Sequence, residues 1–211
     1  MTRFTEKLKS IPLVQIIALI LIVVGVIIMI PRARGMLNFY SEVRYANDNN
    51  FRAGNLSPDL VQPWMSIRYI SVAYAVPQKY LFDFAHIQPR RETSMIALSR
   101  LNQQLMLGQM NGQPVLMKTI MNGILAYRAN PVVTGLIEGH VEDWMNVAYI
   151  ANSTGIPEAT IFSAAGIPPA GNSYKPLGFL SDEFHYSGGR RALVAAIQKV
   201  VDAQAVKPVT P

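Results

Sequence analysis

An internal repeat constrains the fold of this chain more than any other feature of its sequence. Residues 144–169, WMNVAYIANSTGIPEATIFSAAGIPP, repeat residues 64–89, WMSIRYISVAYAVPQKYLFDFAHIQP, at a constant spacing of 80 positions and without a gap. The shared residues include Trp64/Trp144, Met65/Met145, Pro77/Pro157 and Phe82/Phe162. Such a repeat predicts two structural copies of one supersecondary unit.

Each copy is predicted to be a unit of four short helices, the first over 63–130 and the second over 141–206. In the second copy, apolar residues at helical spacing end at Gly155, which suits a left-handed cap, and Pro157 starts the next helix. A helix boundary is likewise expected before Pro77, and no strand is expected in either unit. The link over 131–140 is short, so the units should pack together with Trp64 and Trp144 near their junction.

Upstream of the repeat, residues 11–30 contain no charged side chain and approach the length needed to cross a bilayer. We predict an uncleaved transmembrane anchor at 11–30, a cytoplasmic segment at 1–10 and a stalk at 31–62. The predicted fold class is therefore all-α, with one N-terminal transmembrane helix followed by two tandem four-helix repeat units. The predicted localisation is the cytoplasmic membrane, as a single-pass protein with an extracytoplasmic C-terminal domain.

The sequence contains no residue set that indicates catalysis, a metal or a cofactor. It has no cysteine, and its three histidines, His86, His140 and His185, are far apart in the chain. A zinc site needs three or four convergent ligands. Asp182 and Glu183 fit an exposed helix face, and the run 188–191, Gly-Gly-Arg-Arg, lacks the spacing of a phosphate-binding loop. We therefore expect no enzyme activity and no cofactor; an enzyme with its site between the units has only the scattered histidines in its favour.

One stretch fits a helix-turn-helix. Residues 151–156, followed by Ile161, combine a small residue, a glycine turn and aliphatic side chains at the spacing of that motif. A DNA reader would also present basic or amide side chains on the second helix, whereas residues 157–165 are acidic. A membrane-tethered DNA-binding regulator is the alternative function.

The same stretch resembles a small helical module, built as helix, Gly-Ile-Pro, helix and Leu-x-x-Leu helix, that is appended to bacterial membrane proteins, some of them in electron-transfer systems. The resemblance covers both units, although the first copy has Ala75-Val76 where the second has Gly155-Ile156. It implies a docking role, and it carries over no catalytic residue.

Charge and composition complete the prediction. The net charge is +6 and the chain has ten methionines, which fits a partner protein or the lipid bilayer better than nucleic acid. We predict a non-enzymatic, membrane-anchored accessory or assembly subunit of a larger bacterial complex of respiratory or photosynthetic type. The candidate partner-binding residues are Trp64, Tyr69, Trp144, Tyr149, Arg190 and Arg191.

Overall fold

A computed structural model describes residues 45, 48–51, 54, 56–135, 137 and 139–205. The chain divides into two compact parts, Met1–Asn49 and Asn50–Pro211. In the first part, the backbone N–H of Asn49 donates to the carbonyl of Tyr45 at 3.1 Å. The second part contains both copies of the repeat, which we call the first helical unit (63–130) and the second helical unit (141–205).

Among the described residues, no helix is both long enough and apolar enough to cross a membrane. The predicted fold class, with its transmembrane helix, and the predicted single-pass localisation are corrected by this finding. The longest described helix, α10 (Gly189–Ala205), has 17 residues and includes two adjacent arginines, whereas a span needs about 20 mostly apolar residues. The predicted segments 1–10 and 11–30 lie outside the described residues, as does most of the predicted stalk.

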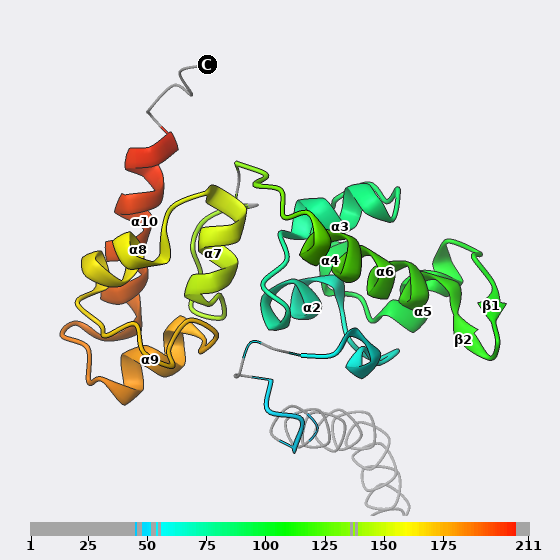
Figure 1. Ribbon diagram of the computed structural model, residues 1–211, viewed down its shortest axis with the longest axis horizontal. Coiled ribbons are helices and arrows are strands. Elements are labelled where there is room, and N and C mark those ends of the chain that lie inside the picture. Colours follow the sequence, from blue (N-terminus) through cyan, green and yellow to red (C-terminus); the bar gives the residue numbers. More distant parts are fainter. Residues whose placement is uncertain are drawn as a thin grey trace, which may run out of the picture. The chain divides into compact units, whose positions relative to one another are not determined.

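The first helical unit contains five α-helices and a short hairpin, preceded by the 3₁₀ turn η2 (Pro58–Leu60) (Figure 1). The hairpin strands pair antiparallel, with Gln109 opposite Pro114 and Met110 opposite Gln113. The elements are α2 (Ile67–Ala73), α3 (Gln78–Phe84), α4 (Arg91–Met95), α5 (Leu98–Gln104), β1 (Gln109–Met110), β2 (Gln113–Pro114) and α6 (Val115–Ala129).

The second helical unit contains four α-helices. These are α7 (Val147–Thr154), α8 (Glu158–Ala165), α9 (Leu177–Glu183) and α10. The chain is thus mostly helical, but the expectation that neither unit contains a strand is wrong for the first. The first unit also has one helix more than the four predicted, because α4 forms where the second unit has a turn over 170–174.

Equivalent residues begin the first helix of each unit. The Ser66 hydroxyl accepts a hydrogen bond from the backbone N–H of Tyr69 at 3.2 Å, and the Asn146 side-chain oxygen accepts one from Tyr149 at 2.8 Å. Each of these side chains satisfies an N–H that the helix itself leaves unpaired. The next helix in each unit follows a proline at its N-cap, Pro77 or Pro157, because proline cannot donate a backbone hydrogen bond.

The two units also share their tertiary hydrogen bonds. The backbone N–H of Leu98 donates to the carbonyl of Met65, and that of Leu177 donates to Met145, both at 2.8 Å. Isolated bridges join Ser66 to Ala97 and Asn146 to Pro176 at the same places. The starts of α5 and α9 are therefore tied to the start of the first helix in the same way in the two units.

Buried apolar side chains at equivalent positions fill the two cores. Phe82 and Phe162 are 0% and 2% exposed, and Leu116 and Leu193 are 1% and 0% exposed. Val72, on α2, packs against the core of the second unit. The two cores are therefore in contact, as expected from the short link.

Candidate functional site

Two side-chain amides of the second unit hold it against the first. Asn146 donates through its Nδ2 to the carbonyl of Val72 at 2.9 Å, and Asn152 donates to the carbonyl of Ala75 at 2.7 Å. Val72 lies in the last turn of α2, and Ala75 lies two residues beyond the end of that helix. These bonds fix the position of α7 beside α2.

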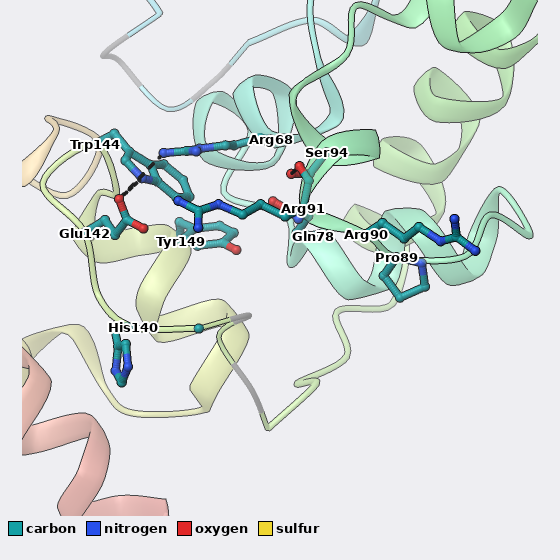
Figure 2. Close-up of a pocket in the computed structure, with 11 residues that line it drawn as sticks. Arg68, Gln78, Pro89, Arg90, Arg91, Ser94, His140, Glu142, Trp144 and Tyr149 are labelled. Atoms are coloured by element: carbon teal, nitrogen blue, oxygen red, sulfur yellow. Dashed lines mark hydrogen bonds and ion pairs between the residues drawn. The ribbon is translucent and has the colours of Figure 1, made fainter. Parts of the chain in front are cut away.

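A groove of about 380 Å³ opens beside this junction (Figure 2). Residues of both helical units and of the link line it. They are Arg68, Gln78, Pro89, Arg90, Arg91, Ser94, Gly139, His140, Glu142, Trp144 and Tyr149. Its volume lies in the range of small-molecule sites in proteins.

The groove has an aromatic wall in the indole of Trp144. The guanidinium carbon of Arg68 lies 3.7 Å from the centre of this ring, within the range of a cation–π contact. The indole Nε1 donates to Glu142 at 3.1 Å, and the same carboxylate lies 3.9 Å from the Arg68 guanidinium. Arg68 is therefore already compensated, by one ring and one carboxylate.

The two other arginines of the groove differ in direction. Figure 2 shows the Arg91 side chain reaching toward Tyr149 and Trp144, whereas the Arg90 side chain points away from them. Neither of these two arginines forms an ion pair with a carboxylate in the part of the chain that is described. Three arginines thus share the groove with one carboxylate, so its net charge is positive.

The groove also contains one serine, Ser94, and one histidine, His140. The hydroxyl of Ser94 donates to the carbonyl of Arg91 at 2.8 Å. Across the described residues, no three His, Cys, Asp or Glu side chains gather in a way that could hold a metal ion. What the arrangement can do is bind a negatively charged group beside an aromatic face.

The predicted partner-binding aromatics fall into two separate clusters. In the first unit, the rings of Trp64 and Tyr69 meet edge to face at 5.4 Å, and Phe51 lies 6.0 Å from Tyr69. In the second unit, Trp144 and Tyr149 lie 6.2 Å apart. Both tryptophans are half-buried, so the loss of 3–5 kcal/mol expected for a fully buried tryptophan does not apply to them. Tyr149 is 2% exposed and belongs to the core.

The two predicted arginines of α10 have different environments. Arg190 pairs with Asp182 of α9 through two hydrogen bonds and lies 3.8 Å from Asp143. These hydrogen bonds lower the pKa of Asp182 and raise the pKa of Arg190. Arg191 is exposed. Arg190 therefore links α9 and α10, and both arginines are exposed to solvent.

Sequence reasoning missed Arg68 and Arg91 as groove residues and missed an apolar surface on the first unit. That surface comprises Leu105, Met106, Leu107 and Met110, which are 41%, 91%, 42% and 52% exposed. We call these four residues the apolar arm. Its signal was visible in the sequence, since no charged residue occurs over 101–117.

The predicted helix-turn-helix is present as α7, a turn at Gly155 with φ 77°, and α8. Helix α8 contains no lysine or arginine. Comparison with protein-family models, with curated proteins and with solved structures finds no match for this chain.

Proposed function

We propose that this protein is a non-enzymatic accessory or assembly subunit that binds partner proteins through its tandem helical units. The observation that supports this most directly is the apolar arm of the first unit. Met106 is 91% exposed, and three further apolar side chains within four residues of it are 41–52% exposed. Clustered exposed apolar side chains of this kind mark interaction surfaces.

The composition of the arm fits a protein partner. Protein interfaces are rich in methionine and poor in charge at their centre, and the arm has two methionines within an uncharged stretch. Methionine side chains are flexible and polarisable, so they adapt to an apolar partner surface.

A tight turn and two hydrogen bonds of Asn102 also define the conformation of the segment that carries the arm. An Asn111-Gly112 turn closes the hairpin, with φ values of 54° and 74°, as a two-residue turn of type I′ requires. Asn102 binds both sides of the arm, donating to the carbonyl of Gly108 and accepting from the backbone N–H of Leu116. Met110 therefore lies on a strand of the hairpin, and Leu105, Met106 and Leu107 lie at the end of α5 and in the connection to that hairpin.

Native electrophoresis and site-specific photo-crosslinking in the source cells test this function. A photo-crosslinking amino acid at position 106 should give one discrete crosslinked species, and the same group at exposed Lys199 of α10 should not. The chain should migrate well above its own mass of 23.4 kDa, and Met106→Asp should reduce that mass while Lys199→Asp leaves it unchanged. Migration as a single chain, together with no crosslink from position 106, would contradict the proposal.

The DNA-binding alternative has less support, because the second helix of its motif exposes no basic side chain to a base edge. Salt-sensitive retention of the protein on DNA would favour it over the subunit proposed here.

A further inference from the structure

The groove between the two helical units has features of a ligand site that are independent of the apolar arm. It lies beside two fixed hydrogen bonds between the units, from Asn146 to Val72 and from Asn152 to Ala75. The packing of the two units therefore sets the position of the groove.

The charges in the groove are unequal. Glu142 is engaged by the Trp144 Nε1 and by Arg68, so the pair of Arg68 and Glu142 is close to neutral. Arg91 reaches toward the same aromatic wall without a carboxylate of its own among the described residues (Figure 2). A guanidinium that forms no ion pair with the described residues is suited to a planar oxyanion, to which it can donate two parallel hydrogen bonds.

The aromatic wall itself adds an apolar face. The Trp144 ring is half-buried, and its one face is already covered by Arg68 at 3.7 Å. A ligand bound by Arg91 would lie near an indole whose electronic environment depends on the neighbouring charge, and this makes Trp144 a reporter of binding.

From this geometry we propose that the groove binds a small molecule carrying a carboxylate or phosphate group, with Arg91 as the principal anion-binding residue and Trp144 as the wall beside it. This goes beyond the proposed function, since it concerns a different surface. Arg68 acts as a positioning residue, because it holds the indole and Glu142 in place.

A fluorescence titration tests the proposal. The chain has two tryptophans, so Trp64→Phe leaves Trp144 as the only one. In this background, inorganic phosphate and citrate are added at constant ionic strength, with sodium chloride as the reference. We expect a saturable change in Trp144 emission with at least one of the two anions and no saturable change with chloride.

Matched variants then locate the site. Arg91→Gln should weaken binding at least tenfold, Arg90→Gln should weaken it less because that side chain points away, and Arg191→Gln on α10 should leave it unchanged. All three arginines are exposed, so the fold should be retained, which circular dichroism verifies. The rise in melting temperature caused by the anion provides a second measurement and should disappear only in Arg91→Gln.

Two outcomes would overturn the proposal. One is the absence of any saturable fluorescence change and of any anion-dependent rise in melting temperature. The other is equal weakening by Arg91→Gln and Arg191→Gln, which would show that the anions act on the overall positive charge of the protein. Neither outcome bears on the apolar arm, whose test uses position 106.

Discussion

The first helical unit carries a helix and a hairpin that the second helical unit does not have. Helix α4 stands where the second unit has a turn, and the hairpin of β1 and β2 lengthens the connection from α5 to α6. The shared helices keep the same caps and the same tertiary hydrogen bonds. The added elements and the longer connection supply most of the apolar arm and Arg91, so the surface differs between the units while the supporting core is shared.

The units also differ in how they form left-handed turns. The first unit has Ala75 and His86 with φ of 50° and 54°, where the second has Gly155 and Gly166 with φ of 77° and 62°. Residues with a Cβ are strained in this region and glycine is not. The second unit therefore forms the same turns with less backbone strain.

The largest expected effect tests whether the two cores are equivalent. Phe82→Ala and Phe162→Ala should each lower the free energy of unfolding by about 3–5 kcal/mol, because each removes a large side chain that is almost fully buried. Urea unfolding measures both values. A difference of several kcal/mol between the two would break the comparison, since it would show that only one unit depends on this position.

The junction should produce the next largest effect. Asn146→Ala removes a helix cap and a hydrogen bond to the first unit, and should cost about 2–3 kcal/mol. Ser66→Ala removes only the equivalent cap, which should cost about 1 kcal/mol. Thermal unfolding of the two variants compares these costs. Equal costs would mean that the amide of Asn146 adds nothing to the contact between the units.

A smaller effect follows from exchanging the residues of one left-handed turn. Gly166→His should destabilise the protein by about 1 kcal/mol, since a Cβ there has open space around it and only the backbone is strained. His86→Gly should have the opposite sign and a smaller size, because glycine also gains entropy in the unfolded chain. The melting temperatures of the two variants show whether each substitution stabilises or destabilises the protein. The same sign for both would contradict the equivalence of these turns.

The smallest effect concerns an ion pair that only the second unit has. The pKa of Asp182 is lowered by its hydrogen bonds to Arg190, so the stability that this pair contributes is present above the ordinary carboxyl pKa of about 4. It is lost as the pH falls through the lowered pKa. Asp182→Asn should therefore reduce the acid sensitivity of the melting temperature slightly, and 0.5 M salt should hide the difference because the pair is exposed. If Asp182→Asn leaves the acid sensitivity at low salt unchanged, the pair of Asp182 and Arg190 does not contribute to stability.

Much of the helical organisation could be read from the repeat. The prolines at 77 and 157, the cap at Gly155 and the spacing of Leu116 and Ile120 all act locally, within a few residues of the helices they define. The hairpin was not predicted, although the dipeptide Asn111-Gly112 is a strong hairpin signal. Two-residue strands leave too short an alternating pattern to be recognised.

The candidate groove could not be read from the sequence in the same way. Arg90 and Arg91 are adjacent in the sequence, but the direction of each side chain depends on how α4 packs against α2. Arg68 and Trp144 are 76 positions apart in the chain, and only the packing of the two units brings them to 3.7 Å.

By itself, the sequence determined the duplication, the prolines and caps that delimit the repeated helices, and the apolar positions that fill both cores. These depend on backbone geometry and helical periodicity, which are local properties. Only the tertiary structure decided that Asn146 and Asn152 donate to the carbonyls of Val72 and Ala75, that Arg190 is paired while Arg91 forms no ion pair with a described residue, and that four apolar side chains at and before the hairpin are exposed. Contacts of this kind depend on which distant residues meet, and the sequence pattern does not specify that.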